Sequence, residues 1–236
     1  MKDCIRKAIP TWLFLVIFNF ISAQSRLSSY GLPYINSIRL YKESLVHHPE
    51  KQMISLSIMP GIILDLRYAS ENNFMHKKLY PGNIRTTFLR KPVYEALDSV
   101  RVYLATLGYE PVIFDAYRPY HITEALWEKV KNDKYAANPA KGSGHNRGIA
   151  IDLSIASLKT RNLVIMPTDF DDFSDSAHQD FKGADPGAVV NRDLLLEVMK
   201  KYGFIPLSTE WWHFSWPDPD NFEVLDLSFE QLDKLK

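Results

Sequence analysis

The sequence predicts an α+β fold in which helices surround a few short strands. Several segments have the apolar spacing of helices and several shorter ones that of strands, and the two kinds do not alternate regularly along the chain. The 236 residues are 46% hydrophobic and 24% charged, which suits one full hydrophobic core. No internal repeat or low-complexity linker divides the chain, so residues 24–236 are predicted to form a single domain.

The first 23 residues are predicted to be a secretory signal peptide. A basic start precedes an apolar run over 12–21, and the small residues Ser22 and Ala23 follow it, so we expect cleavage after Ala23. An uncleaved membrane anchor is the alternative, but the run is short for a bilayer, and no stable membrane insertion is expected after cleavage. The only cysteine, Cys4, lies in this segment, so the mature chain has no disulfide. We expect an exported, periplasmic protein that meets its substrate near the cell wall.

The part of the chain before the main core is predicted to contain one helix and one strand. Residues 24–33 are rich in Ser, Gly and Pro and indicate a mobile leader. Residues 35–48 predict a helix, and His47 and His48 at its end are interpreted as exposed rather than metal-binding. Residues 62–66 predict a strand. The apolar stripe of the helix comprises Ile38, Tyr41 and Leu45.

Residues 91–132 predict a helix, a strand and a second helix. The first helix covers 91–108, with Pro92 in its first turn and Gly108 as its stop. Residues 112–114 predict a short buried strand, and a helix from Pro119 to about residue 132 follows. The buried face of the first helix comprises Val93, Ala96, Leu97, Val100 and Leu104.

The second half of the chain adds one strand and two helices. Residues 149–155 alternate between bulky aliphatic and small residues, which predicts a strand with one core face. Residues 190–202 predict a helix that stops at Gly203, and Ser228 with Gln231 predicts a capped short helix near the end. The inward face of the longer helix comprises Leu194, Leu195, Val198 and Met199.

A histidine and an aspartate seven residues apart, His145 and Asp152, form the first half of a predicted metal site. Gly142, Gly144 and Gly148 allow a tight loop around His145, because glycine adopts backbone angles that other residues avoid. The loop leads into the strand over 149–155, where Asp152 lies on the face with the small residues. A carboxylate within a strand is unfavourable without a partner, and a cation explains its presence.

The aromatic, strand-like segment 208–216 supplies a third ligand, His213. Two nitrogens, one carboxylate oxygen and an open position for water are typical of catalytic zinc. Glu210 would be the general base that takes a proton from the zinc-bound water. Because Glu210 and His213 are three residues apart, a regular strand would place them on opposite faces, so the backbone must bulge or turn there, or Glu210 must precede the strand.

Together these two motifs resemble a known family. The pattern Ser-x-His-x-x-Gly-x-Ala-x-Asp over 143–152, followed by Glu-x-Trp-His over 210–213, is similar to D-alanyl-D-alanine dipeptidases of the VanX type. These enzymes belong to a wider zinc group with lysostaphin-like and D-Ala-D-Ala carboxypeptidases and the hedgehog signalling domain. The similarity runs from about Ser55 to the C-terminus, after a leader to about residue 54 that is expected to vary. It implies a small, mainly antiparallel sheet flanked by helices, with zinc on the sheet's open side.

The resemblance also assigns roles in catalysis. Glu210 is the base, and Arg118 binds and polarises the scissile carbonyl, where a fixed guanidinium stabilises an oxyanion. From the residues alone, Arg118 is equally well explained as a surface charge paired with Asp115. One zinc ion per chain would be held by His145, Asp152 and His213.

Three further residues are expected to bind the substrate. Residues 169–172 contain three aspartates, which indicate either a solvated acidic loop or an acceptor for the substrate's free ammonium group. By the resemblance Asp171 is the ammonium acceptor, and Tyr68 contacts the same end of the substrate. Ser143, within the first motif, is expected to hydrogen-bond the bound peptide. His121 and His178 are interpreted as structural.

These assignments predict a zinc metallopeptidase, a hydrolase that cleaves the small dipeptide D-Ala-D-Ala into two D-alanines. The formal net charge of zero gives no indication of nucleic-acid binding, and the sequence does not indicate an oligomeric state. A D,D-carboxypeptidase acting on peptidoglycan stem peptides is one alternative, and it would need room for an acylated amino end. A non-catalytic zinc-containing binding module is another, but it would need neither Glu210 nor Arg118.

Overall fold

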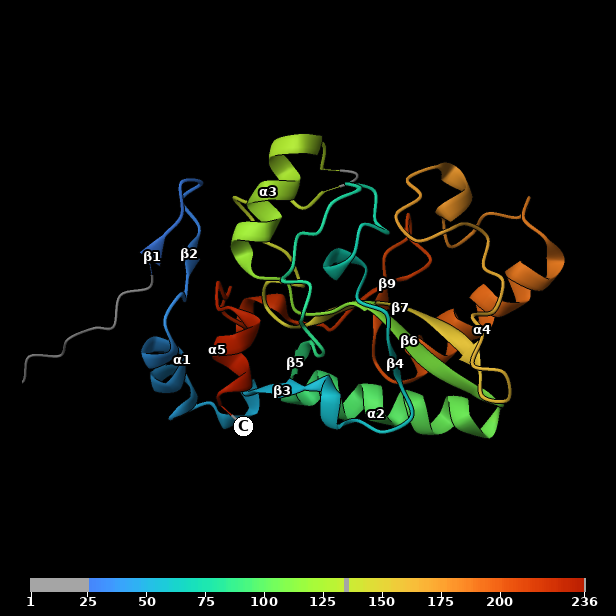
Figure 1. The fold of residues 1–236 in the computed structure, drawn as a ribbon, viewed down its shortest axis with the longest axis horizontal. Coiled ribbons are helices and arrows are strands. Elements are labelled where there is room, and N and C mark those ends of the chain that lie inside the picture. The colour runs from blue at the N-terminus through green and yellow to red at the C-terminus, as the bar shows by residue number, and fades with distance from the viewer. Residues whose placement is uncertain (1–25, 134–135, 236) are drawn as a thin grey trace, which may run out of the picture.

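Figure 1 shows the protein as a computed structural model, which describes residues 26–133 and 136–235. The predicted signal peptide over 1–23 lies outside the described residues. Among the residues that are described, no helix is both long enough and apolar enough to cross a membrane.

The centre of the molecule is a five-stranded sheet with the order β4-β6-β7-β9-β8. Its neighbouring strands are antiparallel except for β4, which runs parallel to β6. The prediction of an α+β fold with a small, mainly antiparallel sheet flanked by helices is therefore confirmed. The strands are β4 (Ile63–Leu64), β6 (Tyr109–Asp115), β7 (Ala150–Ser157), β8 (Ile205–Pro206) and β9 (His213–Ser215).

One face of the sheet packs against helices α2 (Lys91–Thr106) and α4 (Pro186–Lys201), as Figure 1 shows. The buried side chains of these helices form one core cluster with the aliphatic residues of β7. Because side chains alternate along a strand, Asp152 in β7 points to the other face. The core residues from the β7 segment are Ile149, Ile151, Leu153 and Ile155, each exposed by 1% or less.

The register of the sheet determines which polar residues meet on that other face. Asp152 of β7 lies opposite His213 of β9, and on its other side it lies opposite Asp115 at the end of β6. The β6–β7 pairing is irregular between Ile113 and Asp115, which marks a bulge next to this point. Three residues far apart in sequence are thereby brought together on one face of the sheet.

A second core cluster lies beneath the N-terminal and C-terminal segments. It contains Tyr41 of α1 (Ile38–Leu45) and Phe229 of α5 (Phe229–Asp233). The capping box that Ser228 and Gln231 were predicted to form at the start of α5 is present. The remaining elements are β3 (Met53–Ser55), β5 (Phe88–Arg90), α3 (Tyr120–Val130), and short 3-10 helices at Pro49–Lys51, Leu56–Ile58, Arg67–Ala69, Asp175–Ala177 and Pro219–Asn221.

In the described part of the range 24–33, which was predicted to be a mobile leader, the structure has a hairpin. Arg26–Leu27 (β1) and Pro33–Tyr34 (β2) pair as an antiparallel hairpin. Tyr30 in its turn donates a 2.6 Å hydrogen bond to Glu128 of α3. The Ser, Gly and Pro residues here form the turn of a hairpin, a use that composition does not distinguish from an open leader.

Several element boundaries also differ from the predictions. The first helix is shorter, because Ser37 caps it and its last turn ends at Leu45. Helix α4 begins four residues earlier than predicted, with Asp185 as its cap and Pro186 in its first turn. Strand β4 has two residues rather than five, and β6 is longer than predicted, at seven.

Candidate metal centre

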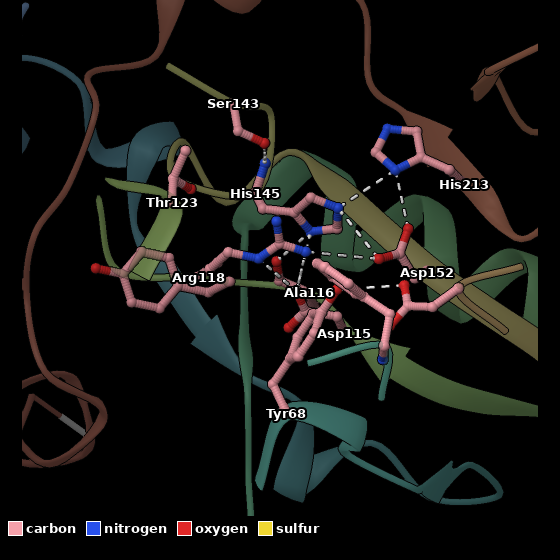
Figure 2. Close-up of polar contacts among 12 residues, drawn as sticks. Tyr68, Asp115, Ala116, Arg118, Thr123, Ser143, His145, Asp152 and His213 are labelled. Atoms are coloured by element: carbon pink, nitrogen blue, oxygen red, sulfur yellow. Dashed lines mark hydrogen bonds and ion pairs between the residues drawn. The ribbon is translucent and has the colours of Figure 1, made fainter. Parts of the chain in front are cut away.

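Three side chains converge on the face of the sheet opposite α2 and α4, and Figure 2 shows how they point toward one another. His145 Nε2 lies 3.3 Å from Asp152 Oδ2 and 3.3 Å from His213 Nδ1. His213 Nδ1 lies 2.9 Å from Asp152 Oδ1. One donor atom from each residue lies within 4.8 Å of the others, which is a spacing that one metal ion can bridge.

The outer nitrogen of each imidazole has a hydrogen-bond partner. The Nδ1–H of His145 donates to the Ala116 carbonyl at 2.7 Å, which leaves a lone pair on Nε2. The Nε2 of His213 lies 3.2 Å from the hydroxyl of Ser215, which can accept its proton, and in that tautomer the lone pair is on Nδ1. Partners of this kind orient histidine ligands around metals.

The arrangement therefore fits a cation. With these tautomers, two nitrogen lone pairs and a carboxylate face one another at about hydrogen-bonding distance, with only acceptors among them. Such a cluster is unfavourable unless a positive charge lies between the donors. Two imidazole nitrogens and one carboxylate oxygen suit a divalent transition metal with an open position.

The positive charge that this cluster needs can also come from protons on the histidines. Burial alone would raise the pKa of Asp152, but the charge of His145 and the hydrogen bonds from both histidines outweigh it and hold that pKa well below its usual value. For His213, burial acts to lower the pKa, but the hydrogen bond to Asp152 outweighs burial and the pKa is raised overall. The aspartate is thus ionised and available as a ligand.

The loop before β7 is closed by hydrogen bonds from its own polar side chains. The hydroxyl of Ser143 accepts the backbone N–H of His145 at 3.2 Å, and its proton remains available to a ligand in the cavity. The side chain of Asn146, fully buried, joins the Ser143 amide to the Arg118 carbonyl. Gly148 has φ of +70°, in the left-handed region. The loop thereby holds His145 against the end of β6.

Glu210 lies in a turn directly before β9, which resolves the spacing problem with His213. The His213 N–H donates to the Glu210 carbonyl at 3.3 Å, so the chain turns between them and the carboxyl group reaches the same cavity as the histidine. Burial raises the pKa of Glu210 to about 7, and the positive charge of His213 opposes this rise. A carboxyl group in this range exchanges protons readily near neutral pH.

Arg118 is both paired with Asp115 and buried at the cavity wall. Its Nε and Nη2 donate to Asp115 Oδ2 at 2.9 and 2.8 Å, and Nη2 lies 3.9 Å from Asp152. The hydroxyl of Tyr80 donates to the other oxygen of Asp115 at 2.8 Å. The guanidinium of Arg118 lies 4.9 Å from the ring centre of Tyr68 (Figure 2). A surface position for this arginine is excluded, because its exposure is 8%.

Of the three aspartates in the acidic loop, Asp171 lines the cavity. The Tyr68 hydroxyl donates to one of its oxygens at 3.3 Å, and the Phe74 N–H donates to the other at 3.4 Å. Burial raises the pKa of Asp171 to about 8, and the negative charge of Asp152 adds to the rise. Its φ of +63° is in the left-handed region, which aspartate tolerates better than most residues do. Asp169 is exposed.

All eight residues predicted for the site line one cavity of about 290 Å³. The edge-to-face pair Phe74 and Phe173, with ring centres 5.1 Å apart, forms the wall near Asp171. The eight residues are Tyr68, Arg118, Ser143, His145, Asp152, Asp171, Glu210 and His213.

Sequence reasoning missed the residues that act through others. Ala116 and Ser215 orient the two histidines, and Tyr80 holds Asp115, which holds Arg118. Ser215 carried a usable signal, because it follows His213 by two residues on a strand and so points to the same side. Within the described residues, His48, His121 and His178 join no cluster of metal-binding side chains.

Comparison with known proteins gives the same family that the motifs suggested. A family model for peptidases of the M15 group, described as D-ala-D-ala dipeptidase, matches residues 50–231. The D-alanyl-D-alanine dipeptidase of Escherichia coli (strain K12) is 31% identical over 175 residues, which cover 74% of this chain and 89% of the relative. That of Enterococcus faecalis (strain ATCC 700802 / V583) is 29% identical over 186 residues, covering 70% and 92%.

Two solved structures show weaker likeness. The LdcB LD-carboxypeptidase is 18% identical with a TM-score of 0.43, and the match covers 78% of this chain and 77% of that one. VanYB in complex with D-Alanine-D-Alanine is 17% identical with a TM-score of 0.36, covering 57% and 74%. Scores this low add nothing to what the family match establishes.

Proposed function

The chain belongs to the D-Ala-D-Ala dipeptidase family of metallopeptidases, and on that premise we propose that it hydrolyses D-Ala-D-Ala to two molecules of D-alanine with one bound zinc ion. The observation that carries the proposal is the convergence of His145, Asp152 and His213 in a cavity that also contains Glu210 and Arg118. The cavity thus combines a metal site, a carboxyl base and a fixed cation.

The three ligands suit zinc by their chemistry. Zinc in catalytic sites binds imidazole nitrogens and carboxylate oxygens and keeps an open position, and His145, Asp152 and His213 supply this donor set. Bound there, zinc would supply Lewis-acid chemistry, which polarises a carbonyl and makes water more acidic. The other tasks in the reaction fall to side chains of this chain.

Glu210 is assigned the proton transfers. Its pKa of about 7 leaves a substantial fraction ionised at neutral pH, so the carboxylate takes a proton from the attacking water. The same carboxyl group then gives that proton to the amine nitrogen of the departing D-alanine as the peptide bond breaks. The turn before β9 places the carboxyl group on the cavity wall beside His213 for both steps.

Arg118 is assigned to the oxygen of the scissile carbonyl. Negative charge develops on that oxygen as water adds, and a positive guanidinium already fixed in place stabilises it. The two hydrogen bonds to Asp115 hold the guanidinium in one orientation. Burial acts to lower the pKa of Arg118, but the charge of Asp115 outweighs it and raises the pKa, so the group stays charged.

Asp171, Tyr68 and Ser143 are assigned to substrate binding. The carboxylate of Asp171 pairs with the free ammonium group of the dipeptide, and Tyr68, which donates to Asp171, completes that end of the cavity. Ser143 offers its hydroxyl proton to the bound peptide. This distribution suits a substrate with a free amino end, because an acylated nitrogen has no charge to offer Asp171.

The proposal is tested by measuring D-alanine released from D-Ala-D-Ala and from its N-acetylated form, with purified zinc-loaded protein. Release from the free dipeptide alone is expected. Equal or faster release from the acetylated form would instead indicate a carboxypeptidase, and the assignments of Asp171 and Tyr68 would be withdrawn. No release from either would favour a binding module.

The role of Glu210 is tested separately by the substitution Glu210→Gln. Zinc should remain bound, because Glu210 is not among the ligands, while kcat should fall by about 10²- to 10⁴-fold, the range for loss of a general base. Glu197→Gln, on the exposed side of α4, is the matched control and should keep full activity. Substantial turnover by Glu210→Gln with zinc bound would contradict the assignment.

We also propose that residues 1–23 direct export and are removed, leaving residues 24–236 as a single periplasmic domain. The basic start, the apolar run and the small residues before Gln24 support this. N-terminal sequencing of the protein recovered from a periplasmic extract should begin at Gln24. A start at Met1 in the membrane fraction would favour the anchor instead.

A further inference from the structure

Gln179 lies outside every motif discussed so far, and we propose that it is a positioning residue for Glu210. The inference rests on the proposed function, in which Glu210 is the general base. The side-chain amide of Gln179 donates from Nε2 to the carbonyl of Glu210 at 3.1 Å and to that of Trp211 at 3.4 Å. It therefore holds the backbone of the residue whose carboxyl group is to transfer protons.

The contact is part of a set of hydrogen bonds between two loops. The backbone N–H of Gln179 donates to the carbonyl of Ser208 at 2.9 Å. The N–H of Trp211 donates to the carbonyl of Ala177 at the same distance, 2.9 Å. Segment 177–179 thus binds both sides of the turn over 208–211. Within the turn region, the hydrogen bond from the Glu210 N–H to the Leu207 carbonyl is 3.3 Å long. The bond from the His213 N–H to the Glu210 carbonyl has the same length. Of the four bonds between the two loops, three are shorter than this, at 2.9, 2.9 and 3.1 Å, and the fourth, to the Trp211 carbonyl, is 3.4 Å.

The orientation of the Gln179 amide is determined by these carbonyls. Both are acceptors, so the nitrogen must face them and the oxygen must point away. The oxygen, Oε1, is buried and has no hydrogen-bond partner among the described residues. A buried amide oxygen without a donor is unfavourable, and an apolar side chain of the same length would avoid it. Glutamine at this position is thus explained by what its nitrogen does for the turn.

The loop that carries Gln179 is itself anchored. It connects β7 to α4 (Figure 1), and the buried side chain of Arg192 in α4 donates to the Phe181 carbonyl at 2.6 Å. The same loop carries Asp171, eight residues before Gln179. One anchored loop therefore supplies the carboxyl group for the substrate's ammonium and the amide that holds the turn of the base.

The inference is tested with Gln179→Met in the full chain loaded with zinc. Methionine keeps the length of the side chain and removes the donor. We expect kcat for D-Ala-D-Ala to fall about 10- to 100-fold, because a displacement of about 1 Å in a reacting group has an effect of that size. KM and zinc affinity should stay within about threefold of the values for the unaltered protein. Tm should fall by no more than about 3 °C or should rise, because the substitution also removes the unpaired amide oxygen. Backbone amides of 208–213 should exchange hydrogen faster, with the rest unchanged.

Two further variants sharpen the result. Gln179→Glu places carboxylate oxygens against the two carbonyls and should lower kcat more than Gln179→Met does. Gln52→Met, at an exposed glutamine, is the matched control and should match the unaltered protein in every measurement.

The outcomes separate the inference from the proposed function. Unchanged kcat and exchange in an active Gln179→Met protein would overturn the inference alone. A parallel loss of kcat, zinc affinity and Tm would also overturn it, because it would show a general structural role. If the unaltered protein does not hydrolyse D-Ala-D-Ala, the proposed function fails and the catalytic role of Gln179 fails with it.

Discussion

Asp171 illustrates how a single residue acquires its properties from its surroundings. Its sequence neighbours Asp169 and Asp172 have the same chemistry, but Asp171 alone among them lines the cavity, between Tyr68 and Phe74. Burial there raises its pKa to about 8, so the free carboxyl group is largely neutral at pH 7. In the proposed function, a cationic group on the substrate compensates for that burial.

This gives a pH prediction for substrate capture. Below about pH 8 Asp171 takes up a proton and cannot pair with an ammonium, so kcat/KM should fall with decreasing pH. A bound metal cation lowers the pKa of nearby carboxyl groups, so the midpoint should lie at or below 8. Above about pH 8 the dipeptide loses its own ammonium proton, which predicts a bell-shaped profile.

The substitution Asp171→Asn tests whether Asp171 causes the fall in kcat/KM at low pH. Asparagine has the same shape and tolerates the left-handed backbone, but stays neutral at every pH. KM for D-Ala-D-Ala should rise about 10- to 100-fold, an estimate from the loss of one charge-assisted bond. The fall in kcat/KM at low pH that is attributed to Asp171 should disappear. Asp169→Asn, at an exposed aspartate, should behave like the unaltered protein, and the same effect from both would contradict the assignment.

Gly148 is a second residue whose identity follows from its position. It has φ of +70°, and a Cβ added to it would lie 2.5 Å from the sulfur of Met53. Gly148→Ala should therefore lower the free energy of unfolding twice over, by about 1–2 kcal/mol for the backbone and about 1–3 kcal/mol for overpacking. Urea unfolding measures the sum.

Gly108 provides the control that separates the two contributions. It has φ of +86°, and a Cβ there would meet no atom within 4 Å among the described residues. Gly108→Ala should cost the backbone contribution alone, about 1–2 kcal/mol. Equal losses in both variants would show that Met53 moves aside without cost, because its side chain is flexible.

At the scale of elements, the site depends on the pairing of short strands. β9 has three residues and gains its position from β7, where the register places His213 opposite Asp152. A slip of β7 by one residue would turn Asp152 to the wrong face. The aliphatic face of β7 prevents such a slip, since it would expose Ile151 and Leu153, which are fully buried.

The contact between α3 and the C-terminal segment predicts a pH-dependent contribution to stability. His121, at the start of α3, lies 2.6 Å from Asp226, whose hydrogen bond raises the pKa of the histidine. The pKa of Asp226 is lowered by the same bond, which outweighs burial. A raised histidine pKa stabilises the fold below about pH 6.5 and loses its effect as the pH rises through the folded pKa. The aspartate loses its effect only below about pH 4.

His121→Gln should therefore lower Tm more at pH 5 than at pH 8. The side chain of His121 is 58% exposed, so solvent screening limits the effect to about 0.5 kcal/mol, or about 1–2 °C. Thermal unfolding of both proteins across this range measures it. A larger loss at pH 8 than at pH 5 would reverse the predicted sign and contradict the ion pair.

At the scale of the whole molecule, the metal site joins segments that are distant in sequence. His145 comes from a loop, Asp152 from β7 and His213 from β9, so an ion bound to all three restrains the centre of the sheet. An ion that binds the folded chain but not the unfolded one stabilises the fold by mass action.

Removal of the metal should lower Tm for this reason. At a zinc concentration about 1,000 times its Kd the stabilisation is about 4 kcal/mol, which corresponds to a fall in Tm of about 8–16 °C on adding EDTA. Calorimetry with and without EDTA measures it, and added zinc should restore the higher value. His213→Ala should show little response to either, and a full EDTA effect in that variant would place the stabilising ion elsewhere.

Much of the site was predictable because its residues lie in two short motifs. His145 and Asp152 are separated by a glycine loop and an alternating strand, and Glu210 and His213 by a single turn. The main helices were predictable for the same local reason, since their apolar spacing and their stops lie within each segment. The hairpin over 26–34 was not, because its partner Glu128 lies about a hundred residues away.

What the sequence alone determined was the set of candidate metal ligands, the family resemblance and the α+β class, because these follow from residue types and spacing within short segments. Only the tertiary structure decided which aspartate of the acidic loop enters the cavity, that Arg118 is buried against Asp115, and that Gln179 reaches the turn of Glu210. Each of these contacts joins segments whose approach depends on strand register and loop anchoring. Register and anchoring arise from packing across the whole molecule, and no local pattern encodes them.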